Sequence, residues 1–100
     1  MKVTMTQHAV KRTKERAGIP KSAATRNAEK ALQFGIQHNE TSGSLNRYLT
    51  GLYFKHKTAN NVRIYCNNVY IFNGAKLITM FQLPQKYRGT AEKIARGKLC

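Results

Sequence analysis

The chain has 100 residues, with 18 lysines and arginines against four acidic residues, so its formal net charge is +14. A chain of this length forms one small domain. Four glutamates without any aspartate cannot build the carboxylate cluster by which metal-dependent nucleases and phosphatases hold divalent cations. We therefore expect no metal ion and no cofactor, and the positive charge favours a polyanionic partner such as a nucleic acid.

The two cysteines and the N-terminal residues bear on the cellular compartment. Cys66 lies within an apolar run, where we expect it to be a small core residue, and Cys100 is the last residue. Neither belongs to a CxxC motif, and a disulfide framework would normally use four or more cysteines. No apolar stretch has the length of a signal peptide or of a membrane span. We expect a cytoplasmic protein that does not bind a membrane.

The first half of the chain predicts three helices. The first spans residues 6–17, with Thr6 as its N-cap and Gly18 at its end. The second spans about 22–35 and carries its alanines on one stripe, opposite a basic face. The third spans roughly 43–57. Its apolar face holds Leu45, Tyr48, Leu49, Leu52 and Tyr53.

After residue 60 apolar and polar residues alternate, which is the pattern of β-strands. Turns are predicted at Asn67-Asn68 and at Asn73-Gly74, and Pro84 ends the last strand, so this part forms a three-stranded antiparallel meander. With two-residue turns, one face of the sheet gathers Val62, Ile64, Cys66, Val69, Ile71, Ile78 and Met80. The other face gathers Arg63, Tyr65, Tyr70, Phe72, Leu77, Thr79 and Phe81.

These elements predict an α+β fold in which about three N-terminal helices precede a small antiparallel meander of three or more strands. The helices are expected to pack on one face of the sheet. Residues 1–85 form a single domain. Residues 86–100 form a basic C-terminal tail, which we expect to be mobile or to form a short, frayed helix.

One face of the first helix carries residues suited to RNA cleavage. His8, Arg12, Glu15 and Arg16 fall within an arc of roughly 100° on a helical wheel. Metal-free cleavage needs a base for the 2′-hydroxyl, an acid for the leaving 5′-oxygen and cations for the phosphate. Imidazole and guanidinium groups supply all three functions. The same residues are also consistent with simple phosphate contact, with a solvated helix face or with a histidine that caps the core.

The sheet offers a second candidate surface. Arg63, Tyr65 and Tyr70 interleave a cation with aromatic rings, as in sheets that stack unpaired bases. The alternative is that these aromatic side chains form a second core beneath the helices. Further basic residues that we expect to contact nucleic acid are Arg26, Lys30, Arg47, Lys55 and Lys57.

The order of these motifs resembles that of small proteins encoded by phages and mobile elements, a toxin-like group with the barnase, EndoU, colicin and RelE ribonuclease fold. The likeness covers roughly residues 5–84. It rests on the H-x3-R-x3-R of the first helix, Gly-Ile-Pro at 18–20, the strand segments 59–65 and 69–72, and Leu-Ile-Thr-Met-Phe-Gln-Leu-Pro at 77–84.

The resemblance implies RNA cleavage without metal. His8 would be the general acid or base, and Arg12 and Arg16 would hold the scissile phosphate. Arg63, Tyr70 and Thr79 would line the sheet side of the site. The chain lacks the Glu/His pair across the sheet that better-known members have, so the second proton-transfer residue stays open.

Our leading hypothesis is a metal-independent endoribonuclease that acts in the cytoplasm, the host's if a phage encodes it. A small acidic protein is the inhibitor that such a toxin would have. The alternative is a non-catalytic phage effector that binds RNA, DNA or a ribonucleoprotein, for example a CRISPR inhibitor.

Overall fold

A computed structural model describes residues 3–18 and 20–99, and for residues 16, 17, 98 and 99 it describes the backbone alone. The elements follow the chain as β1 (Thr4–Met5), α1 (Gln7–Ala17), α2 (Lys21–Phe34), β2 (Ile36–Gln37), the short 3-10 helix η1 (His38–Glu40), α3 (Gly43–Lys55), β3 (Asn61–Tyr65), β4 (Asn68–Asn73), β5 (Lys76–Gln82) and α4 (Gln85–Leu99). The strands form one mixed sheet in the order β1-β5-β4-β3-β2, in which β1 is parallel to β5 and all other pairs are antiparallel.

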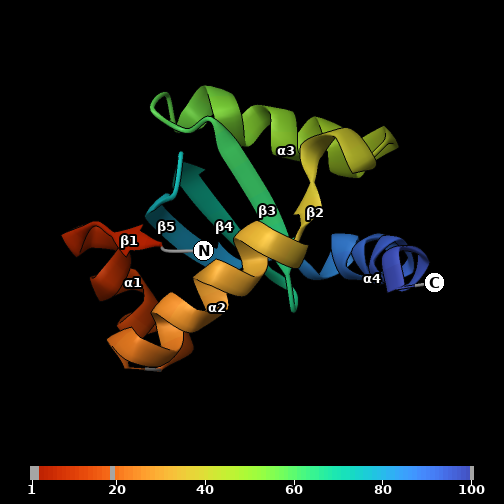
Figure 1. Ribbon diagram of the computed structural model, residues 1–100. Helices are drawn as coiled ribbons and strands as arrows, with labels where there is room; N and C mark the ends of the chain where they lie inside the picture. Colours follow the sequence, from red (N-terminus) through yellow and green to blue (C-terminus); the bar gives the residue numbers. More distant parts are fainter. Residues whose placement is uncertain (1–2, 19, 100) are drawn as a thin grey trace.

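Helices cover both faces of the sheet, with α1 and α2 on one side and α3 and α4 on the other (Figure 1). Each face buries its own core. The core under α1 and α2 contains Val3, Ala9, Ala28, Ala31, Tyr70, Phe72, Leu77 and Met80. The core under α3 and α4 contains Ile36, Leu45, Leu49, Leu52, Val62, Ile64, Val69, Ile71, Leu83 and Ala91.

The predicted fold class is therefore wrong in its arrangement, although helices and an antiparallel meander are both present. The helices flank both faces instead of one, the strands lie in the middle of the chain, and the chain ends on helix α4. Strands β1 and β2 have two residues each, which is too short for any alternation to mark them in the sequence. Helix α4 contributes Ala91 to the core, with Ile94 and Ala95 packed against it. This apolar stripe is narrow, so the sequence did not predict an ordered helix here. The division between residues 1–85 and a separate tail stays a prediction.

The meander of β3, β4 and β5 is confirmed, but a bulge changes the faces of its last strand. Tyr70 pairs with Met80 and Ile71 with Thr79, whereas Phe72 pairs with Leu77. The irregularity leaves Ile78 as an extra residue on β5, so every side chain beyond it points to the face opposite the predicted one. Thr79 and Phe81 consequently share the α3 side with Ile71, and Met80 joins the core under α1 and α2.

The first turn of the meander also differs from the prediction. Cys66 and Asn67 form it, with φ of 50° and 62°, and Asn68 already belongs to β4. Because this shift moves the pairing by two residues, the faces of β3 and β4 stay as predicted. Cys66 is exposed in the turn and is not the core residue that its apolar neighbours indicated.

Candidate active site and nucleic-acid interface

Two anchors hold the start of α1 against strand β5. The backbone N–H of Thr6 donates to the Leu77 carbonyl at 3.1 Å, and the Thr6 hydroxyl donates to the Ile78 carbonyl at 3.1 Å. The same hydroxyl caps the helix, because it accepts a hydrogen bond from the Ala9 N–H at 3.0 Å. Both predicted ends of this helix, the Thr6 cap and the left-handed Gly18, are confirmed. His8 is thereby fixed beside the β1–β5 edge of the sheet.

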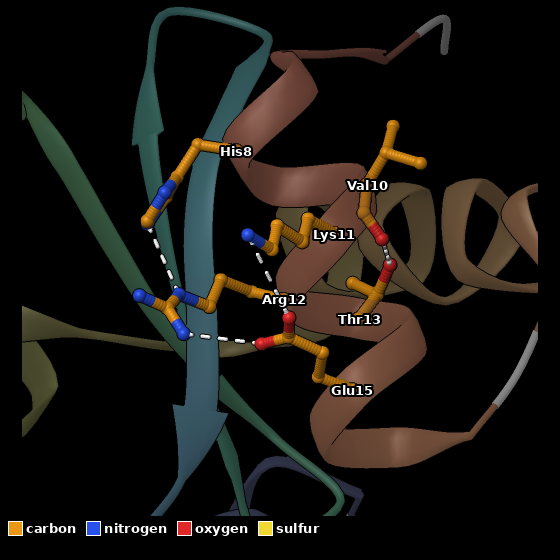
Figure 2. Close-up of polar contacts among 6 residues, drawn as sticks. All are labelled: His8, Val10, Lys11, Arg12, Thr13 and Glu15. Atoms are coloured by element: carbon orange, nitrogen blue, oxygen red, sulfur yellow. Dashed lines mark hydrogen bonds and ion pairs between the residues drawn. The ribbon is translucent and has the colours of Figure 1, made fainter.

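The exposed face of α1 carries a chain of polar contacts (Figure 2). Arg12 Nε donates to His8 Nε2 at 3.4 Å, and Arg12 Nη1 lies 3.1 Å from Glu15 Oε2. Lys11 Nζ lies 4.0 Å from the other oxygen of Glu15. Thr13 is buried and its hydroxyl donates to the Val10 carbonyl on the other side of the helix. One helix face therefore packs inward while the opposite face presents imidazole and guanidinium groups to solvent, as predicted.

These contacts contribute little to stability. Exposed pairs at i,i+3 and i,i+4 stabilise a helix by only about 0.2–0.5 kcal/mol each. The carboxylate of Glu15 instead restrains the guanidinium of Arg12. Both side chains nevertheless remain partly exposed, at 36% for Arg12 and 45% for Glu15. Arg12 is thus oriented beside the imidazole and still open to an anion from solvent.

A second histidine lies at the same end of the sheet. His56 is the C-cap of α3, where its N–H donates to the Leu52 carbonyl at 2.8 Å. The loop that follows is tied to the β4–β5 turn, because Asn60 N donates to the Phe72 carbonyl at 3.1 Å and Asn60 Oδ1 accepts from Gly74 N at 2.8 Å. The β1–β5 contacts that hold His8 start directly after that turn.

The electrostatics of His56 agree with this placement. Partial burial lowers the pKa of His56 below its ordinary value, and the positive charges of Lys55 and of His8 lower its pKa further. His56 is therefore neutral at neutral pH, with a ring nitrogen that can accept a proton.

A pocket of about 640 Å³ lies between α3 and β5, and Lys55, the residue before His56, is part of its lining. Its lining combines the basic Arg47 and Lys55 with the aromatic Tyr48 and Phe81, together with Gly51 and Leu52. Arg47 and Lys55 are both exposed. Cationic and aromatic groups around one hollow are what a chain of phosphates and bases needs.

The remaining predicted catalytic residues do not join this group. Tyr70 is 3% exposed in the core under α1 and α2, where burial above all raises the pKa of its phenol to about 12. Thr79 is 4% exposed and lies on the opposite face of the sheet, because of the bulge in β5. The two hydroxyls therefore do not line one groove with His8. The side chain of Arg16 lies outside the described residues.

Some of the residues predicted to contact nucleic acid are half-buried, and the others are exposed. Arg63 and Tyr65 are half-buried on β3, on the side of the sheet that α2 covers, and Arg63 Nε is buried without a hydrogen-bond partner among the described residues. Arg26 and Lys30 are exposed on α2. Lys57 is exposed just after His56, and it continues the basic surface that Arg47 and Lys55 begin. Tyr70 and Phe72 of the predicted stacking surface are thus covered, whereas Tyr65 lines a pocket of about 450 Å³ together with Phe34 and Cys66.

His56 is the residue that sequence reasoning undervalued. Between Lys55 and Lys57 it had the appearance of one more member of a basic patch, and nothing in the local pattern relates it to His8. Only the end of α3, the β4–β5 turn and the start of α1 together bring the two rings to one end of the sheet. The proximity of a lysine on each side was the one available indication that its pKa would be shifted.

No protein family, curated protein or solved structure matches this chain. The resemblance to the barnase, EndoU, colicin and RelE group therefore stays a prediction. No helix among the described residues has the length and apolar character needed to cross a membrane. In that same part of the chain no three histidine, cysteine or acidic side chains are grouped as a metal site would require.

Proposed function

We propose that this protein is an RNA-binding endoribonuclease that cleaves its substrate at the α1–α3 end of the sheet without a metal ion. The observation that carries the proposal is the placement of His8 and His56, from helices far apart in the sequence, at the end of the sheet where the β4–β5 turn lies. Arg12 beside one ring and Lys55 beside the other supply the cations that a phosphodiester requires.

The lowered pKa of His56 fits it for the role of general base. In the proposed reaction its neutral ring accepts the proton of a ribose 2′-hydroxyl, and the 2′-oxygen attacks the adjacent phosphorus. A bound phosphate draws the Arg12 guanidinium away from His8 Nε2, which leaves that nitrogen free to carry a proton, and His8 gives this proton to the 5′-oxygen as the phosphorus–oxygen bond breaks. The products are a 2′,3′-cyclic phosphate and a free 5′-hydroxyl, so protons and charge balance.

In this reaction Arg12 would bind the scissile phosphate. Without a ligand its Nε donates to His8 and its Nη1 donates to Glu15, so a phosphate would take over the hydrogen bond that His8 accepts. A guanidinium in this place can form two parallel hydrogen bonds with the non-bridging oxygens as charge develops on them. Removal of such a group typically lowers the rate by roughly a hundred-fold or more.

The test is cleavage of total RNA by the purified protein in EDTA, with end-group analysis of the fragments. The wild type should generate cyclic phosphate ends. His8→Gln and His56→Gln should each lower the rate by at least roughly a hundred-fold, because each removes one proton transfer. RNA affinity should change little. Lys21→Ala, at an exposed position of α2, is the matched control and should cleave like the wild type.

A result without cleavage would favour the alternative hypothesis, in which the basic surface serves binding alone. If the wild type binds RNA but leaves it intact, the two histidines serve binding alone. The protein is then a non-catalytic ligand of RNA or of a ribonucleoprotein. If neither histidine variant affects a cleavage that the wild type does perform, the active site lies elsewhere.

A further inference from the structure

On one face of α3 a glycine stands between two basic residues. Arg47, Gly51 and Lys55 follow one another at i, i+4 and i+8 along the helix and all line the pocket beside β5. A Cβ on Gly51 would meet no atom within 4 Å, so no packing partner requires a glycine here. Glycine is less favourable than alanine inside a helix. What the glycine provides is open space between two cations.

Aromatic rings form the inner side of that space. Tyr48 and Phe81 are half-buried and line the pocket from α3 and from β5. Tyr48 is itself held in place by Tyr87 of α4, with ring centroids 4.7 Å apart and planes inclined by 29°. Lys86 Nζ lies 5.1 Å from the centroid of the Tyr87 ring. The rings are thus fixed before any ligand arrives, which lowers the entropy lost on binding.

We propose that the pocket over Gly51 takes one unpaired base of the RNA, stacked against Tyr48 and Phe81, while Arg47 and Lys55 contact the phosphates on either side. The substrate is therefore a single strand, because a base inside a duplex is already stacked and paired. This inference rests on the proposed function, since Lys55 is followed directly by His56.

The pocket can be filled without disturbing the core. Gly51→Leu adds a side chain on an exposed helix position, and leucine favours helix more than glycine does. Gly89→Leu is the matched control, because Gly89 of α4 is exposed, also has no atom within 4 Å of an added Cβ, and does not line this pocket. Far-ultraviolet circular dichroism and thermal unfolding verify that both variants fold.

Fluorescence anisotropy should be measured with two probes that carry equal charge. One is a 2′-O-methyl oligouridine decamer, which cannot be cleaved because the attacking hydroxyl is blocked, and the other is an abasic decamer. Stacking of one base is worth roughly a five-fold to 150-fold change in affinity. We expect the wild type and Gly89→Leu to bind the oligouridine tighter by a factor in that range. Gly51→Leu should bind both probes equally and as weakly as the wild type binds the abasic one.

The results separate this inference from the function on which it rests. Equal binding of both probes by the wild type, or a base preference that survives in Gly51→Leu, overturns the base pocket and leaves RNA binding intact. Failure of the wild type to bind either probe, or total RNA, overturns the pocket and the proposed function together.

Discussion

The hydroxyl of Thr6 connects helix α1 to the carbonyl of Ile78 in the bulge of β5, at 3.1 Å. The same oxygen accepts the N–H of Ala9 at 3.0 Å, so one side chain both caps the helix and fixes it to the sheet. Ile78 is the extra residue of the bulge, so the side chains that follow it in β5 point to the opposite face of the sheet. The position of His8, two residues beyond Thr6, therefore depends on an irregularity in a strand at the other end of the sequence.

Thr6→Val should destabilise the protein by about 1–2 kcal/mol, because it keeps the shape of the side chain and removes both hydrogen bonds. Urea unfolding monitored by circular dichroism measures the change. Thr58→Val, in the exposed loop after α3, is the matched control and should lie within about 0.5 kcal/mol of the wild type. Equal midpoints for the two variants would contradict the anchoring role.

Ala91→Glu tests whether α4 is an integral part of the fold. Ala91 is 3% exposed under the sheet, so a carboxylate at this position would be buried without a partner. We expect a loss of at least about 2 kcal/mol in the free energy of unfolding. Thr90→Glu makes the same charge change at an exposed neighbour and should be nearly neutral. If both variants unfold alike, residues 86–100 behave as a tail.

Parts of the fold with strong local patterns could be predicted from the sequence, and parts that depend on distant contacts could not. The cap at Thr6, the left-handed Gly18 and the alternation of β3 and β4 are local, and each is present. Strand β1 exists only because Thr4 and Met5 meet β5 from across the chain. The bulge at Ile78 likewise has no local mark, and it reversed the predicted face of Thr79.

The candidate site shows the same division. The helical face of His8 and Arg12 follows from residue spacing alone, so it could be recognised in the sequence. The relation between His8 and His56 requires the path of α3 across one face of the sheet and the path of α1 across the other. Aromatic residues on β3 and β4 were candidates for base stacking, but Tyr70 and Phe72 are buried under α1 and α2, whereas Tyr48 and Phe81 line a pocket between α3 and β5.

A titration of the histidine rings by NMR should give His56 a pKa below the ordinary 6.5, because burial and the charges of Lys55 and His8 oppose its protonation. His8→Gln removes one of these charges, so the pKa of His56 should rise in that variant. His38→Gln is the control, since His38 is hydrogen-bonded to Thr50 at 2.8 Å and is not among the groups that act on His56. An unchanged His56 pKa in His8→Gln would mean that the rings are not coupled.

The same shift makes stability depend on pH in a defined direction. A group whose folded-state pKa is lowered binds protons more readily in the unfolded state. The free energy of unfolding should therefore decrease as the pH falls through the unfolded-state value near 6.5. His56→Gln should reduce this decrease between about pH 7 and pH 5. Urea midpoints measured at several pH values give the comparison, and parallel curves for the two proteins would contradict a lowered His56 pKa.

The salt dependence of RNA binding should identify which cations contact phosphate. Each phosphate contact on a single strand contributes roughly 0.7 to the slope of log affinity against log salt concentration. Arg47→Ala and Lys55→Ala should each reduce the slope by about that amount, because both side chains line the pocket under α3. Lys21→Ala removes an equal charge from α2, away from the proposed path of the RNA, and should lower affinity slightly without changing the slope by a full contact. If all three variants lose the same increment, the protein attracts RNA by its net charge of +14 and not through a defined groove. If only the α3 variants lose it, the groove beside His56 is where the strand lies.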